Sequence, residues 1–113
     1  MTESNINIKV QLDAEKVPQQ ISWSAEGSTA AAPQTAKSML LALWDAKEKS
    51  AMRIDLWTKD MMVDEMADFY YQVFVTMADT FQRATKHTEL TNDIKSFAKK
   101  FQKKFNEIEE AKK

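Results

Sequence analysis

The chain has 113 residues and a net charge of -1, so it lacks the basic surplus that bulk nucleic-acid binding needs. Its apolar content of 43% is enough for a hydrophobic core, and its length is that of one small domain spanning residues 1–113. The absence of cysteine excludes disulfides, thiolate zinc sites and a cysteine nucleophile.

The first residues, MTESNINIKVQLD, alternate apolar with polar side chains and contain no long apolar run. This pattern is unlike a signal peptide, and no later run reaches the length of a membrane span. We therefore expect a cytoplasmic protein without stable membrane insertion.

Two strands are predicted at the start of the chain. Residues 6–12 alternate strictly, with Ile6, Ile8, Val10 and Leu12 on one face. Val17 and Pro18 open a second run in which Ile21 and Trp23 share a face. The short polar connector between the runs predicts a β-hairpin.

The middle of the chain is predicted as loop, helix, turn and strand. Residues 25–34 hold the only glycine and the second proline, which indicates a flexible loop. Thr35 can cap a short helix, whose apolar stripe is Ala36, Met39, Leu40, Leu43 and Trp44. Residues 45–50 form a charged turn. The third strand follows, with Met52, Ile54 and Leu56 inward and Arg53, Asp55 and Trp57 outward.

Two helices are predicted at the end of the chain. The first begins after Asp60, a candidate N-cap, and runs to about Lys86. The second follows a break at Lys86–Thr88, and residues 110–113 are expected to fray.

The predicted order is strand, strand, helix, strand, helix, helix. It indicates the α+β class: a small, mainly antiparallel three-stranded sheet with the helices packed on one face. A right-handed crossover between strands two and three would give the strand order 2-1-3.

No catalytic, cofactor-binding or metal-ligating residue is predicted. A single glycine cannot build a phosphate-binding loop. The only histidine, His87, has no identifiable nucleophile or orienting carboxylate and is interpreted as a surface residue. Capping and helix-dipole effects account for the acids at Asp60, Asp64 and Glu65. The chain is accordingly predicted to be no enzyme.

The outward side of the third strand is the candidate interaction face. Arg53, Asp55 and Trp57 point the same way in a regular strand, and Arg and Trp are typical of interface hot spots. The alternative is that Trp57 packs under the 25–34 loop or a helix, with Arg53 and Asp55 pairing to a neighbouring strand.

The basic end of the chain is the second surface of interest. Residues 86–113 hold 8 Lys and 5 acidic residues, and Lys95, Lys99 and Lys103 recur at helical spacing. Such a helix can bind a partner, a lipid surface or nucleic acid. A solvated face over an apolar core stripe is the simpler interpretation.

The chain resembles the gliding motility-associated GldC family of Bacteroidetes. The resemblance lies in Val17-Pro18 with Ile21–Ser24, in Ala36-Lys37 with Met39–Asp45, in Arg53–Met61 and in Met77–Phe81. These pieces occur in the family's order between about Ile6 and Phe105. The resemblance implies a small cytoplasmic accessory protein of gliding motility, and it implies no reaction, cofactor or site residue.

These observations favour a non-enzymatic protein–protein interaction module whose partner is a protein of the gliding machinery. One alternative is a self-associating structural or chaperone-like protein, and hence a homo-oligomer. Another is a small-ligand-binding domain with a pocket between helix and sheet.

Overall fold

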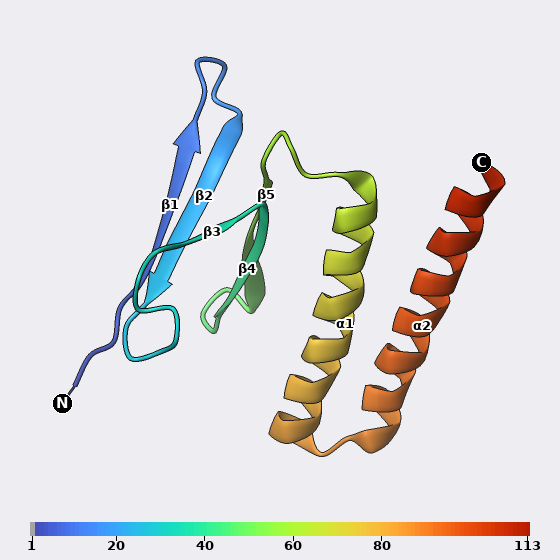
Figure 1. The fold of residues 1–113 in the computed structure, drawn as a ribbon. Helices are drawn as coiled ribbons and strands as arrows, with labels where there is room; N and C mark the ends of the chain where they lie inside the picture. Colours follow the sequence, from blue (N-terminus) through green and yellow to red (C-terminus); the bar gives the residue numbers. More distant parts are fainter. Residues whose placement is uncertain (1) are drawn as a thin grey trace. The chain divides into compact units, whose positions relative to one another are not determined.

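The computed structural model describes residues 2–113, which form two antiparallel sheets and two helices. The elements are β1 (Ile6–Leu12), β2 (Pro18–Ala25), β3 (Gln34–Ala36), β4 (Ser38–Asp45), β5 (Ser50–Trp57), α1 (Val63–Thr85) and α2 (Thr88–Ala111) (Figure 1). The predicted α+β class is confirmed. The chain divides into two compact units, an N-terminal unit up to Met61 and a helical unit from Met62 to Lys113. That the whole chain is one domain, with its helices on one face of a sheet, stays a prediction.

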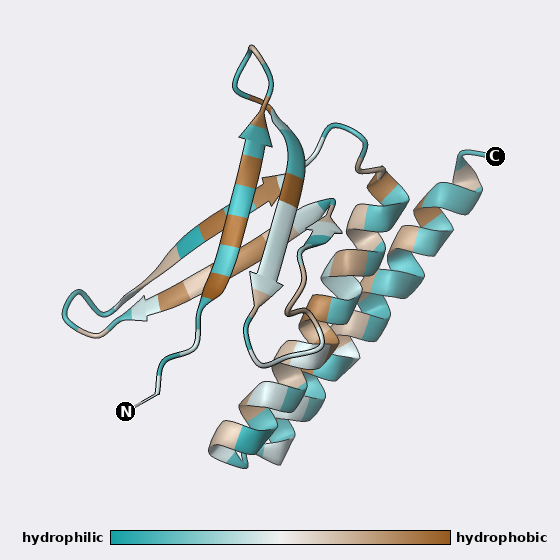
Figure 2. Cartoon of the chain, turned by 60° about the vertical axis from the view of Figure 1, so that its left-hand side comes forward, coloured by the Kyte–Doolittle hydropathy of each residue, from teal (hydrophilic) through white to brown (hydrophobic). Residues whose placement is uncertain are grey.

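The first sheet contains the predicted hairpin. β1 and β2 pair antiparallel, and β3 adds to the other edge of β2, so the order is β1-β2-β3. Val10 lies opposite Ile21, and Ile21 lies opposite Ala36, so one apolar row crosses the three strands. Ile21 is only 1% exposed and is the largest fully buried side chain among residues 2–113. The alternation of apolar and polar residues along β1 is visible in Figure 2.

Asp13 organises the turn between β1 and β2. Its carboxylate accepts hydrogen bonds from the N–H groups of Glu15 (2.8 Å) and Val17 (3.0 Å) and forms an ion pair with the Lys59 ammonium. The hydrogen bond from Lys59, then that from Val17, lowers the pKa of Asp13 from 3.8 to about 2. The turn at one end of the hairpin is thereby tied to the segment that follows β5.

An acid-dependent loss of stability is expected from this carboxylate. Because its pKa is lower in the folded chain, the charged form stabilises the fold above about pH 4, and that stabilisation is lost as the pH falls through about 2. The Asp13→Asn variant should therefore be less stable than the parent chain near neutral pH, and the difference should shrink across this window. Urea unfolding at several pH values measures it. Glu15, an exposed residue of the same turn, provides the control. The Glu15→Gln variant should change the free energy of unfolding little. A constant difference from neutral pH to pH 2 would contradict the role of the charge.

The segment between the second predicted strand and the charged turn is β-structure, so the predicted helix over residues 35–44 is wrong. Gln34–Ala36 form β3 and Ser38–Asp45 form β4. The run from Met39 to Trp44 is continuously apolar, and such a run fits a helical stripe as well as a strand. The deciding partner is β5, which pairs with β4 along its whole length.

The connection between β4 and β5 is the predicted charged turn. The Asp45 carboxylate accepts hydrogen bonds from the N–H groups of Lys47 (2.9 Å) and Glu48 (3.0 Å). Lys49 adopts the left-handed conformation with φ 54°. An Asp that binds backbone two residues on is typical of tight turns, and here it directs β5 back along β4.

The third predicted strand does not lie beside the first, so the predicted order 2-1-3 is wrong. β5 pairs with β4 in a separate two-stranded sheet, from Ser38 opposite Trp57 to Asp45 opposite Ser50. Once residues 38–45 are a strand, the nearest partner along the chain is β5 itself, because a short turn joins them. The turn of this hairpin projects beyond the first sheet in Figure 2.

The chain leaves β5 through a well-bonded segment. The Thr58 N–H donates to the Lys37 carbonyl (2.8 Å), and its hydroxyl donates to the Asp60 carboxylate (2.5 Å). Thr58 is 3% exposed. The hydrogen bond from Thr58 lowers the pKa of Asp60. Asp60 therefore stabilises this segment. The prediction that Asp60 is the N-cap of α1 is wrong, because Met62 is the N-cap.

The helical unit is a hairpin of two long helices (Figure 1). Met62 is the N-cap of α1, and the Glu65 carboxylate accepts its N–H at 3.1 Å. Asp64 and Glu65 occupy the first turn, as predicted, where the helix dipole favours negative charge. α1 ends at Lys86 in the left-handed conformation with φ 63°, which confirms the predicted break. α2 is helical through Ala111, and the fraying of residues 110–113 stays a prediction.

Small residues and aromatic rings hold the two helices together. Phe74 of α1 packs edge-on against Phe97 and Phe101 of α2, with ring centroids 5.4 and 5.3 Å apart. Ala78 and Ala98 are fully buried. The helices are thus in close contact through alanine positions flanked by phenylalanine rings.

Candidate functional site

The predicted interaction residues lie together on one face of β5. Arg53 and Asp55 form an ion pair at 3.1 Å, and Trp57 is 57% exposed. The alternative in which Trp57 packs under the 25–34 loop would require it to be buried. That loop instead closes on itself, since the Ser28 hydroxyl donates to the Ala25 carbonyl at 2.7 Å.

Trp44 belongs to the same face. Directly opposite residues of an antiparallel pair project from the same side of the sheet. Trp44 lies opposite Ala51, and Ala51 shares its face with Arg53, Asp55 and Trp57. We call the four residues Trp44, Arg53, Asp55 and Trp57 the tryptophan face. A tryptophan thus stands at each end of a central ion pair.

Trp44 was predicted to belong to a buried helical stripe, and that prediction is wrong. Its side chain is 68% exposed. The helical interpretation placed it on one stripe with Met39 and Leu43, whereas alternation along a strand puts those two residues on the opposite face of the hairpin. The signal that could have identified it is the charged turn, because a short turn between two apolar runs is typical of a hairpin.

The opposite side of the hairpin is aliphatic. Three cross-strand pairs cover it, and they are Met39 with Leu56, Leu41 with Ile54, and Leu43 with Met52. We call these six residues the aliphatic face. The predicted separation of Met52, Ile54 and Leu56 from Arg53 and Asp55 is correct. Their predicted burial holds only in part, since Leu56 is half-buried whereas Met52 and Ile54 are exposed.

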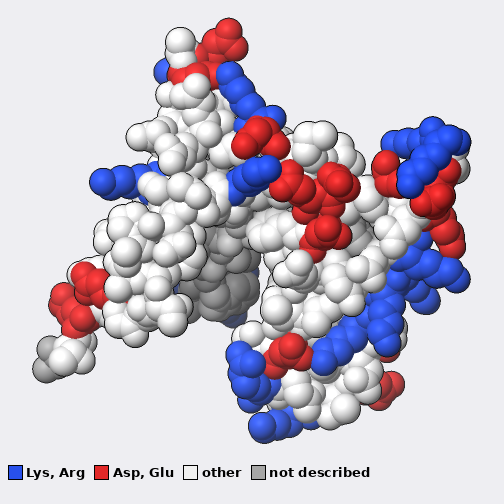
Figure 3. Space-filling model, viewed as in Figure 1, with Lys and Arg blue, Asp and Glu red and all other residues white. Residues whose placement is uncertain are grey.

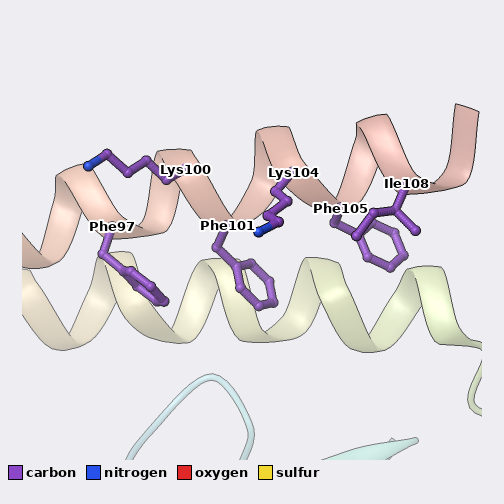
Figure 4. A pocket seen from close by; sticks show the side chains of 6 residues that line it. All are labelled: Phe97, Lys100, Phe101, Lys104, Phe105 and Ile108. Carbon is purple, nitrogen blue, oxygen red and sulfur yellow. The ribbon is translucent and has the colours of Figure 1, made fainter. Parts of the chain in front are cut away.

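A third apolar surface lies on α2. Phe97, Lys100, Phe101, Lys104, Phe105 and Ile108 line an open cavity of about 450 Å³. Figure 4 shows the three phenylalanine rings on the side of α2 that faces α1, while Lys100 points away from it. Phe97 is 54% exposed. Lysine side chains gather along α2 in Figure 3, as the sequence indicated.

The titratable groups of residues 2–113 form no evident reaction centre. His87 is exposed at the junction of the helices, where its ring lies 6.4 Å from that of Phe81. No group of three or more His, Cys, Asp or Glu in this range could hold a metal ion. Neither helix in the described part of the chain combines the length and apolarity that crossing a membrane requires.

Comparison with known proteins gives a family match over most of the chain. A family model described as "Gliding motility-associated protein GldC-like" matches residues 18–107, which include both sheets from β2 onward and most of α2. No curated protein and no solved structure matches the chain. Because the match covers most of the sequence, the chain belongs to the GldC-like family of gliding motility-associated proteins.

Proposed function

We propose that the chain is a non-enzymatic, cytoplasmic accessory protein of gliding motility that binds another protein of the gliding machinery through the tryptophan face. The observation that carries the proposal is the exposure of two tryptophans, Trp44 at 68% and Trp57 at 57%, on one side of a two-stranded hairpin. The family match supports the cellular process, and the hairpin surface supports the mode of action.

The energetics of an exposed hairpin favour a binding role. A two-stranded hairpin is marginally stable in water by itself. Large contiguous apolar patches are uncommon on proteins that stay free in solution and mark interaction sites. A partner that covers the tryptophan face would remove two indole rings from water, and this stabilises both the complex and the hairpin.

The ion pair within the face contributes orientation more than affinity. Arg53 and Asp55 are 54% and 40% exposed, and exposed pairs contribute about 0–1 kcal/mol. Their mutual contact neutralises the centre of the face and holds the guanidinium in place beside Asp55. The partner surface is therefore expected to be mainly apolar, with polar groups that meet the centre of the face.

Affinity purification from native cells, with the tagged chain as bait, tests the proposal. Trp44→Ala and Trp57→Ala should each cost about 2 kcal/mol or more, equivalent to a roughly 30-fold weaker complex, because buried tryptophans are hot-spot residues. Recovery of the partner should fall accordingly, whereas Arg53→Ala should have a smaller effect.

Leu12→Ala is the matched control, since Leu12 is 51% exposed on the other sheet. It should recover the partner as the parent chain does. Circular dichroism establishes that each variant is folded. Equal recovery by all variants would sink the proposed face, and recovery of no gliding protein by any variant would sink the partner class.

A further inference from the structure

The edge of β5 that faces away from β4 can pair with another strand. Within residues 2–113 no strand pairs with β5 on the side opposite β4. An exposed strand edge presents a row of N–H and C=O groups that can bind another strand.

Backbone alternation identifies the outward groups. The Thr58 N–H donates to the Lys37 carbonyl at 2.8 Å, so Lys37 and Thr58 form a hydrogen-bonded pair. Hydrogen-bonded pairs recur at every second residue, which turns the backbone of Met52, Ile54 and Leu56 toward β4. The Ser38 hydroxyl of β4 donates to the Leu56 carbonyl at 3.1 Å, which agrees with this orientation. The N–H and C=O groups of the intervening residues, from Ala51 to Trp57, therefore point away from β4.

We propose that β5 pairs antiparallel with β5 of a second copy of the chain, about a two-fold axis at Ile54. In this register Arg53 of each copy lies opposite Asp55 of the other. Met52 lies opposite Leu56, Ile54 opposite its own copy, and Ala51 opposite Trp57. The outward N–H and C=O groups of one β5 strand then form hydrogen bonds with those of β5 in the second copy.

Charge complementarity selects this register. Because the outward-pointing groups alternate along β5, the register between the two copies can change only in steps of two residues. Moving the axis to Arg53 places two arginines directly opposite each other, and moving it to Asp55 places two aspartates opposite. Like charges directly opposite are destabilising, whereas opposite charges stabilise a sheet. The Ile54 register alone among these three gives two ion pairs.

The side chains fit the same register. On the aliphatic side, Met52, Ile54 and Leu56 meet apolar residues of the second copy. On the tryptophan side, Trp57 of one copy meets Ala51 of the other, whose small side chain leaves room for an indole ring. The two-stranded sheets become one four-stranded sheet, which exceeds the size at which an isolated hairpin is marginal. Isologous contacts of this kind are the usual basis of two-fold dimers.

The dimer and the complex with a gliding protein are separate interactions. The dimer pairs the backbone edge of β5 and neighbouring side chains, and the side of the sheet that carries the tryptophan face stays accessible from above. A dimer would present two copies of that face side by side on one sheet. Binding of a gliding protein could fail while the dimer persists, and the reverse also holds, so the two proposals have different tests.

A single-cysteine cross-link tests the register, because the chain has no cysteine of its own. Ile54→Cys places two thiols directly opposite each other across the axis, and mild oxidation should give a covalent dimer in high yield. Met52→Cys is the matched control, since Met52 is an exposed residue of the same face that meets Leu56 and not its own copy. Equal cross-linking at both positions, or none at Ile54, would overturn the register.

Charge reversal tests the interface by light scattering. The chain should have twice its monomer mass of 13.0 kDa at concentrations above the dissociation constant. Arg53→Asp and Asp55→Arg should each weaken the dimer by roughly tenfold or more, since both create like-charge pairs. An equimolar mixture of the two variants should regain the dimer, because two carboxylates then face two guanidiniums. A parent chain that stays monomeric at every soluble concentration, or a mixture that stays as weak as the single variants, would overturn the proposal.

Discussion

Replacing Ile21 with alanine is expected to lower the free energy of unfolding by about 2–5 kcal/mol. Ile21 lies in the central strand of the first sheet, between Val10 and Ala36, and is 1% exposed. The substitution removes buried methyl and methylene groups and leaves a cavity that the two flanking strands can close only in part. The loss is a large share of the stability of a typical small domain, which is about 5–15 kcal/mol.

Urea unfolding followed by tryptophan fluorescence measures this effect, because all three tryptophans lie in the N-terminal unit. Ile6→Ala is the control, since Ile6 lies in the same sheet but is 71% exposed. It should change the free energy of unfolding by no more than about 0.5 kcal/mol. Equal effects of the two substitutions would show that the row through Val10, Ile21 and Ala36 is not the core of this sheet.

Replacing Ala98 with leucine should destabilise the helical hairpin by about 1–3 kcal/mol. Ala98 is 0% exposed on α2, and Ala78 on α1 is buried to the same degree. A leucine at this position must displace the neighbouring helix or adopt a strained rotamer. Its slightly different helix propensity is too small to offset that cost.

Far-UV circular dichroism follows this variant, because residues 63–85 and 88–111 supply the helical signal. Ala84→Leu makes the same change at an exposed position of α1 and should be close to neutral. Equal stability of Ala98→Leu and Ala84→Leu would mean that the two helices do not meet at Ala98.

Local patterns predicted the outer parts of the chain well. The strict alternation of Ile6, Ile8, Val10 and Leu12 fits only a strand, and the structure forms β1 there. The long apolar stripes fit only helices, and the break at Lys86 needs a left-handed residue that ends α1. In each of these segments one periodicity explains the sequence and no other does.

The middle of the chain could not be predicted in the same way. Residues 39–44 are apolar at every position, so both periodicities fit, and the choice depends on pairing with β5. Pairing is a non-local property that no window of sequence contains. The predicted strand order was wrong for the same reason, because a helix over residues 35–44 would have required a crossover between the second and third predicted strands.

The candidate site was also predicted only in part. Arg53, Asp55 and Trp57 were predicted to share a face because alternation within one strand is local. Trp44 was missed because its place depends on the register between β4 and β5, in which it meets Ala51. The exposure of Phe97 on α2 also lay beyond the sequence pattern, since an aromatic stripe usually indicates core.

Site-specific photo-cross-linking in native cells tests most directly whether the tryptophan face binds a protein of the gliding machinery. A photoreactive phenylalanine analogue would replace Trp57 in one strain and Leu12, which is exposed on the other sheet, in a second strain. A covalent adduct with a gliding protein, distinct in mass from a dimer of the chain, is expected from position 57 and not from position 12. Equal adducts at both positions, or no adduct with a gliding protein at position 57, would contradict it.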